Sequence, residues 1–196
     1  MMVEKERYLV FHIDDKIFAI DIDRVKKVIK EKGDSLRITG LDQAPKQVIG
    51  IAEVEITQNE KKLITFIDFK SLSGVKTFLQ EYDNIYDQDS EKTNDSKGKQ
   101  LMDSEKMEEG EKIYDMLRRR VFVIISHPEK ENYIGILVNR VEGISDFING
   151  KNAYFYEAPN IRGVKDLFTH VIISYPTEKK IFVIKTEKIF EMSGVD

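Results

Sequence analysis

Apolar residues in this chain recur in short runs that are either alternating or continuous and are rich in β-branched and aromatic side chains. Most runs end at Gly, Pro, Asp or Lys-rich turns, and this pattern is typical of a β-rich fold. Asp14, Asp15 and Lys16 between the first two runs predict a hairpin turn. The predicted strands are Tyr8–Ile13, Ile17–Ile22, Val48–Ile56, Leu63–Phe69, Val121–Ile125, Tyr133–Val138, Val171–Ser174 and Ile181–Lys185.

Helical spacing appears only in short pieces. Asp23 is placed to cap a helix over Arg24–Lys30, in which Val25, Val28 and Ile29 share one face. A second helical turn is predicted after Asp68, over Phe69–Leu72. The predicted class is therefore mainly β with short helices.

One segment, Gln80–Asp115, differs in composition from the rest of the chain. It holds 12 acidic residues and five lysines, with few β-branched residues before Gly110. Such a stretch buries too little apolar surface to offset its ordering entropy, so most of it is expected to be a mobile linker. Two interpretations stay open, a tolerated insertion and a docking segment. The predicted subdomains are residues 1–79 and 116–196, with residues 80–115 between them.

The chain contains an internal repeat. Phe18–Val28 aligns with Ile134–Ile144 at an offset of 116 residues. Ala44–Ile51 resembles Ala158–Val164, and Glu60–Phe66 resembles Glu178–Ile184 at an offset of 118. Similar pieces in the same order indicate a duplicated unit. Each unit has enough runs for five strands, which close most easily into a small SH3-like β-barrel because closure removes exposed edges.

Composition and charge narrow the possible functions. The formal net charge is -4. The absence of cysteine excludes disulfides, thiol nucleophiles and Cys-based metal sites. Residues 4–7 are charged where a signal peptide is apolar, and no apolar run approaches the roughly 18 residues of a membrane span. We therefore expect a soluble, cytoplasmic protein.

Candidate catalytic chemistry is sparse. His12, His127 and His170 share no metal-ligand spacing, and the chain lacks the glycine-rich phosphate loops and the Gly-x-Ser-x-Gly elbow. Carboxylates such as Asp21 and Asp23 are too numerous to single out a catalytic pair. We predict no catalytic residue, no metal and no cofactor, so binding is the expected function.

The ordered pieces Tyr8–Ile29, Ala44–Ile51, Leu63–Phe69, Ile134–Val138 and Gly163–Ile184 resemble the CheW-type coupling proteins of bacterial chemotaxis. The resemblance covers almost everything outside residues 80–115 and implies two five-stranded barrels without catalysis. It also implies binding to the regulatory domain of a CheA-type histidine kinase and to the cytoplasmic tip of a chemoreceptor, with recruitment to membrane receptor arrays but no direct membrane insertion.

The resemblance implies two surfaces by position. The apolar receptor-binding groove is expected to use Val25, Val28, Gly135, Val138, Val141 and Ile144, although Val25, Val28, Val141 and Ile144 are equally compatible with an ordinary barrel core. The kinase-binding side is expected to use Ile49, Gly50, Glu55 and Asp68.

The chain departs from the family pattern at three places. Glu55 lies in a lengthened segment where the family has an Asn-Leu-Arg-Gly turn, Lys27 stands at a usually acidic position, and Asn139 replaces Asp. We therefore expect a specialised paralogue with its own matched partners.

The alternative from another class is a small β-barrel nucleic-acid-binding protein, because barrels of this kind often bind RNA or DNA. The acidic balance disfavours it. Its main support is the basic cluster Arg118–Arg120, which is more typical of a solvated strand entry.

Overall fold

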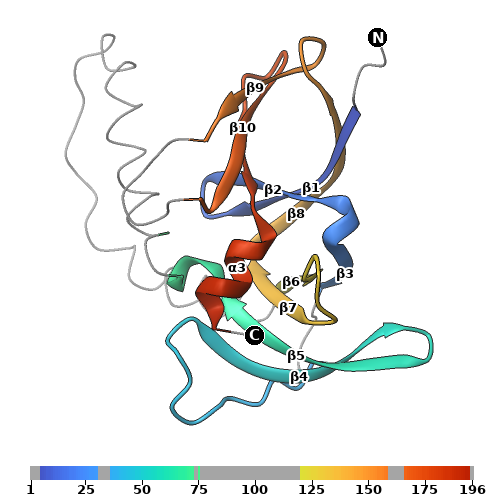
Figure 1. Cartoon of the computed structure of the whole chain (residues 1–196), viewed down its shortest axis with the longest axis vertical. Helices are drawn as coiled ribbons and strands as arrows, with labels where there is room; N and C mark the ends of the chain where they lie inside the picture. The colour runs from blue at the N-terminus through green and yellow to red at the C-terminus, as the bar shows by residue number, and fades with distance from the viewer. Residues whose placement is uncertain (1–4, 31–35, 73–74, 76–119, 159–165, 195–196) are drawn as a thin grey trace, which may run out of the picture.

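The computed structural model describes residues 5–30, 36–72, 75, 120–158 and 166–194. Its strands form two curled sheets that lie one above the other in Figure 1. The six-stranded sheet has the order β8 (Arg140–Ile148), β1 (Lys5–Ile13), β2 (Lys16–Asp21), β11 (Lys180–Ile184), β10 (Phe168–Ser174) and β9 (Ala153–Glu157). The five-stranded sheet has the order β3 (Val25–Lys30), β6 (Val121–Ser126), β7 (Tyr133–Val138), β5 (Glu60–Asp68) and β4 (Val48–Thr57).

This architecture confirms the mainly β prediction and all eight predicted strands. Three further strands, β3, β8 and β9, were not predicted. The turn after Asp68 is confirmed as the 3-10 helix η2 (Phe69–Ser71), with the Asp68 carboxylate accepting from the backbone N–H of Lys70 at 3.1 Å. One eight-residue helix, α3 (Thr186–Ser193), was not predicted.

The predicted helix over Arg24–Lys30 is wrong. The 3-10 helix η1 (Ile22–Arg24) is capped by Asp21, and β3 follows it directly. β3 carries a β-bulge between Val25 and Lys27 where it pairs with β6. The extra residue, Lys26, returns Val25 and Val28 to one face of the strand, so an apolar spacing of three arises without a helix.

The repeat is visible in the strand pairing. Val28 pairs with Val123 in one sheet, and the matching residue Ile144 pairs with Leu9 in the other. Both ladders have a bulge at the matching place, next to Val25 and next to Val141. Parallel pairing also recurs, between β2 and β11 and between β7 and β5. The Phe18–Val28 alignment is thereby confirmed.

The other two aligned pieces need correction. The ladders place Thr65 opposite Ile134 and Phe182 opposite Phe18, so β5 and β11 match at an offset of 117 rather than 118. A slip of one residue exchanges the faces of a strand, so 117 is the offset that keeps inward residues inward. Gly50 matches His170, since each follows a bulge in its ladder, whereas Gly163 lies outside the described residues.

The two sheets do not follow the predicted division into residues 1–79 and 116–196. β1 and β2 belong to the sheet formed mostly by strands after residue 140, and β6 and β7 belong to the sheet formed by β3, β4 and β5. The first two strands of each repeat therefore lie in the same sheet as the later strands of the other repeat. The predicted linker, residues 80–115, lies outside the described residues.

The core has three parts. A shared core takes side chains from both sheets and from α3, which lies between the sheets in Figure 1. Its largest fully buried members include Phe11, Phe18, Phe69 and Phe182. A smaller core lies on the other face of each sheet, around Tyr8 and Phe147 in one and around Phe66 and Phe122 in the other. The shared core joins the two repeats into one body.

Candidate protein-interaction surfaces

The predicted receptor-side residues lie mainly on β3 and β8, the matching edge strands of the two sheets. The bulges turn Val25 and Val28 on β3, and Val141 on β8, towards the shared core, where all three are half-buried. Ile144 pairs with Leu9 on the same face, yet 61% of its surface is exposed. These four residues therefore form the apolar margin of the shared core on the two edge strands.

Two predicted receptor-side residues lie deeper. Val138 is 4% exposed within the shared core. Gly135 is buried on the other face of β7, where an added Cβ atom would lie 2.5 Å from the Phe66 ring. The structure does not bring Gly135 together with the four margin residues, because successive residues of a strand face opposite sides.

A polar cluster holds β8 against β1. His12, only 7% exposed, lies 2.8 Å from the Glu142 carboxylate through its Nε2 atom. The Arg140 guanidinium lies 3.4 Å from His12 Nδ1, and Lys179 Nζ donates to Glu142 at 3.2 Å. The His12 hydrogen bond is the largest cause of a lowered pKa at Glu142, and Lys179 adds to it. Glu142 is thus held as a carboxylate at the bulge of β8.

The predicted kinase-side residues have mainly structural roles. Ile49 is the bulged, half-buried residue of β4. Gly50 is required by the close approach of the Thr39 carbonyl, which would lie 2.3 Å from a Cβ atom. Asp68 caps η2 and also accepts from Ser71 Oγ at 2.7 Å. Of the four, Glu55 alone has an exposed side chain with no hydrogen bond among the described residues.

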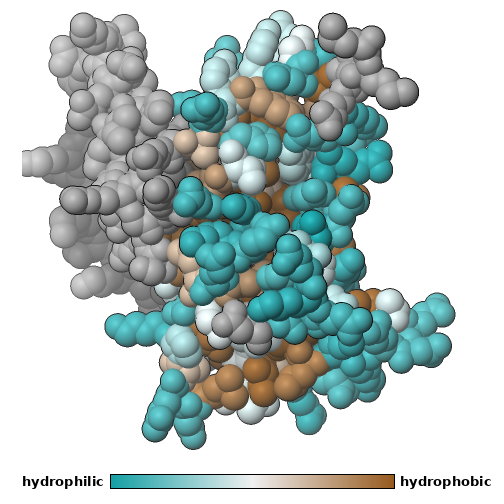
Figure 2. Space-filling view, in the orientation of Figure 1, coloured by the Kyte–Doolittle hydropathy of each residue, from teal (hydrophilic) through white to brown (hydrophobic). Residues whose placement is uncertain are grey.

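The β4–β5 hairpin that carries Glu55 projects at the lower right of Figure 1. Its outer face pairs Lys61 with Glu53 at 3.0 Å, and Leu63 on that face is 68% exposed. Figure 2 shows apolar surface over the β4–β5 region at the bottom of this view, below a band of hydrophilic residues. The hairpin therefore offers a mixed apolar and charged surface within the segment expected on the kinase side.

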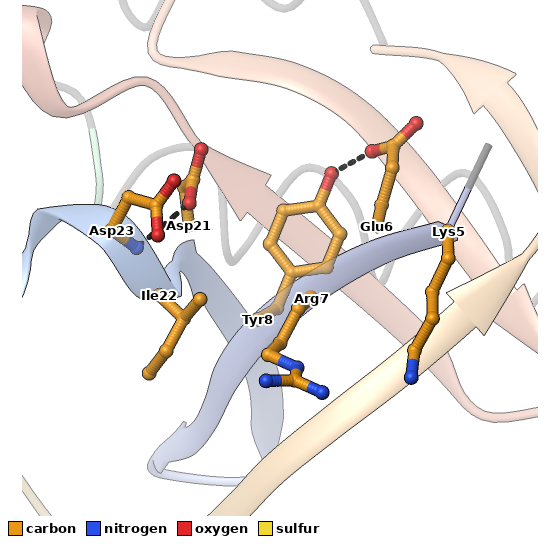
Figure 3. Close-up of a pocket in the computed structure, with 7 residues that line it drawn as sticks. All are labelled: Lys5, Glu6, Arg7, Tyr8, Asp21, Ile22 and Asp23. Carbon is orange, nitrogen blue, oxygen red and sulfur yellow. Dashed lines mark hydrogen bonds between the residues drawn. The ribbon is translucent and has the colours of Figure 1, made fainter.

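A pocket of about 410 Å³ lies beside the start of β1 and was also not predicted. Its residues come from β1 and from the β2–η1 junction, and Figure 3 shows Lys5 and Arg7 on the opposite side of β1 from Glu6 and Tyr8. Lys5 and Arg7 already hold Asp146, each at 2.8 Å. Its charges serve contacts within the fold, so this pocket is a weak candidate for a ligand site.

The remaining histidines have structural partners. His127 Nδ1 accepts from the backbone N–H groups of Glu129 and Lys130 at 3.0 and 3.1 Å, and the ring packs on Phe190. His170 stacks on Phe155 and lies 3.3 Å from the Tyr8 hydroxyl. Burial lowers the pKa of His170, because the charged imidazolium loses solvation there.

Burial also raises the pKa of Tyr8, whose hydroxyl is hydrogen-bonded to the Glu6 carboxylate. In the part of the chain that the structure describes, no group of three or more His, Asp or Glu side chains is arranged to hold a metal ion. Within the same residues, no helix has the length and apolarity needed to span a bilayer.

The basic cluster of the nucleic-acid alternative is only partly described, since Arg118 and Arg119 lie outside the described residues. Arg120 directly precedes β6, and its guanidinium lies 5.9 Å from the centre of the Phe122 ring. This cation–π contact directs Arg120 along its own sheet.

Comparison with known proteins bears on the fold. No protein-family model matches the chain, and no curated protein matches its sequence. Among solved structures, the chain is similar to the scaffolding protein TtCheW from Thermoanaerobacter tengcongensis, with 17% sequence identity and a TM-score of 0.59. The match covers 97% of this chain and 96% of the other. The likeness therefore extends to both sheets.

Proposed function

We propose that this chain, which has the fold of a CheW scaffolding protein, is a non-catalytic adaptor that couples chemoreceptors to a CheA-type histidine kinase. The observation that carries this proposal is the full-length likeness of fold to a protein described as a scaffold. The site chemistry agrees with it, since His12, His127 and carboxylates such as Glu142 and Asp68 hold the fold together. The nucleic-acid alternative is not favoured by this likeness.

On this proposal the receptor tip contacts the apolar margin formed by Val25, Val28, Val141 and Ile144, with Val138 and Gly135 supporting it from the core. Helix-in-groove recognition uses apolar side chains on a rigid frame, and two bulged edge strands on a shared core supply such a frame. The kinase domain contacts the region of Ile49, Gly50, Glu55 and Asp68. The adaptor acts in the cytoplasm, recruited to membrane receptor arrays.

The proposal is tested by calorimetric titration of the full chain with two probes from the same organism. These are the regulatory domain of its CheA-type kinase and a soluble hairpin of its chemoreceptor tip. We expect micromolar or tighter binding of both. Ile144→Asp should weaken receptor-tip binding by about tenfold or more while leaving kinase binding unchanged. Absence of binding to both probes by the folded protein would overturn the adaptor proposal.

The Glu55 carboxylate provides a separate prediction on the kinase side. Glu55 stands where the pattern of the CheW-type proteins has Arg, and its side chain is exposed on the hairpin. Glu55→Arg should therefore strengthen binding to a kinase domain from an ordinary chemotaxis system by several-fold. Glu53→Arg, one outward position earlier on the same strand, is the matched control for the change in charge. Equal affinity of wild type and Glu55→Arg would count against a specialised partner.

A further inference from the structure

The edge strand β3 and the residue before it carry four cations, Arg24, Lys26, Lys27 and Lys30, with no acidic residue between them. None of the four makes a hydrogen bond or ion pair with a carboxylate among the described residues. Lys27 Nζ donates to a backbone carbonyl, that of Glu55, at 2.6 Å. Lys26, Lys27 and Lys30 are exposed. The strand therefore displays positive charge that the described part of the fold does not neutralise.

The repeat supplies an internal reference for this observation. On β8, Arg140 matches Arg24, Glu142 matches Lys26, and Asp146 matches Lys30. Every one of these β8 charges has a partner: Arg140 contacts His12, Glu142 contacts His12 and Lys179, and Asp146 contacts Lys5 and Arg7. Glu142 and Asp146 of β8 thus have charged partners, whereas Lys26 and Lys30 at the matching positions of β3 have none among the described residues.

The basic character of β3 is local. The chain as a whole has a net charge of -4, so a general affinity for polyanions is not expected. Val25 and Val28 lie between the cations and are half-buried at the margin of the shared core. A partner that covers this strand meets apolar surface and positive charge together. That combination suits a protein segment better than a phosphate backbone.

From the unneutralised cations of β3 and their neutralised counterparts on β8, we propose that β3 docks an acidic, amphipathic segment of a partner protein. Its carboxylates pair with Lys26 and Lys30, and its apolar side chains cover Val25 and Val28. This inference rests on the proposed function in one respect, because it assigns a charge to the receptor-side partner. It requires the carboxylate-bearing face of that partner to lie on β3 rather than on β8.

The test uses the full chain and its charge variants. The double variant Lys26→Glu/Lys30→Glu removes two β3 cations, and Lys46→Glu/Lys151→Glu changes the net charge equally at two exposed lysines elsewhere. Binding to the receptor-tip hairpin should weaken by about tenfold or more in the β3 variant and by less than about twofold in the control. Added salt should weaken wild-type binding and have little effect on the β3 variant. Equal effects of the two double variants would overturn the proposal.

A second probe separates this inference from the adaptor function. The ¹⁵N-labelled chain is titrated with a helical peptide that has glutamates on its polar face and leucines on its apolar face, and with the same peptide carrying glutamines. Shifts of β3 resonances with the glutamate peptide alone support the inference even where the receptor tip does not bind. If neither peptide shifts the β3 resonances, the proposal is overturned. The lysines would then serve only to keep the exposed edge of β3 from pairing with another strand. Shifts with a DNA duplex but not with the glutamate peptide would also overturn the proposal.

Discussion

The side chain that Gly135 lacks would occupy space already filled by the Phe66 ring. An added Cβ atom would lie 2.5 Å from two ring carbons of Phe66 and 3.1 Å from Ile124. Phe66 is itself fully buried and packs edge-on against Phe122, with 4.9 Å between ring centres, so it has little room to move. The glycine is therefore needed for packing inside the five-stranded sheet.

Gly135→Ala is accordingly expected to lower the free energy of unfolding by about 1–3 kcal/mol, because overpacking forces buried rings off their preferred positions. Urea denaturation followed by circular dichroism measures this change. Gly40→Ala, where nothing lies within 4 Å of the added atom, is the matched control and should be nearly neutral. Equal stability of the two variants would show that Phe66 yields to the methyl group.

Glu142 predicts a pH dependence of stability. Its pKa in the folded protein is lowered from 4.5, first by the His12 hydrogen bond, whereas the unfolded chain keeps the ordinary value. Its stabilising contribution is therefore fully present above about pH 4.5 and is lost as the pH falls through the folded-state pKa. Glu142→Gln should cost about 1 kcal/mol at pH 7 and progressively less below pH 4.5.

Denaturation at a series of pH values measures the difference between Glu142→Gln and wild type. Glu157→Gln removes a carboxylate that has no hydrogen bond or ion pair among the described residues, so its effect should be small at every pH. A difference for Glu142→Gln that stays constant down to pH 3 would contradict the proposed electrostatic origin.

At the scale of elements, the matching β-bulges in β3 and β8 decide which residues reach the shared core. Removing Lys26 by deletion should turn Val28 to the other face of β3 and cost about 2 kcal/mol or more in the free energy of unfolding. Lys26→Ala keeps the bulge and the strand length, so it should change stability by less than about 0.5 kcal/mol. Chemical denaturation compares the two, and similar small effects would show that the register of β3 is not fixed by the bulge.

The bulges also explain where sequence prediction succeeded and failed. Runs with plain alternation or continuous apolar character, such as Val121–Ile125, gave correct strands. Val25 and Val28 repeat at a spacing of three because of the bulge, which imitates a helix, and Val141 and Ile144 have the same spacing on β8. β9 was not predicted because its outward face carries two tyrosines, Tyr154 and Tyr156, each 52% exposed, so polar and apolar residues do not alternate along the strand.

The candidate surfaces were predictable to a different degree. The apolar positions at the margin of the shared core follow from the repeat, since Val25 and Val141 are identical in the aligned pieces. The pattern of apolar residues does not distinguish a margin residue such as Ile144 from a buried one such as Val138, because exposure depends on strands distant in sequence. For the same reason, the ion pairs of β8, and their absence on β3 within the described residues, emerge only from the folded arrangement.

At the scale of the whole molecule, each repeat completes the sheet of the other, so neither half of the chain contains a finished sheet. Separate fragments comprising residues 1–100 and 101–196 should each lack cooperative unfolding, because each leaves a shared-core face uncovered. Mixing the fragments should restore a single cooperative transition and dispersed amide resonances. A fragment that unfolds cooperatively alone would show that the exchanged strands are dispensable.

The exchange of the first two strands between the repeats has a consequence for how such a protein can originate and diversify. A single repeat standing alone would complete its sheet by exchanging those two strands with a second copy, which makes a symmetric homodimer the natural forerunner of the fused chain. In a homodimer both copies of the repeat carry the same residues, so any new charge appears twice. Fusion removes that restriction, and the presence of Lys26 and Lys30 on β3 where β8 has Glu142 and Asp146 is a difference that a homodimer cannot hold.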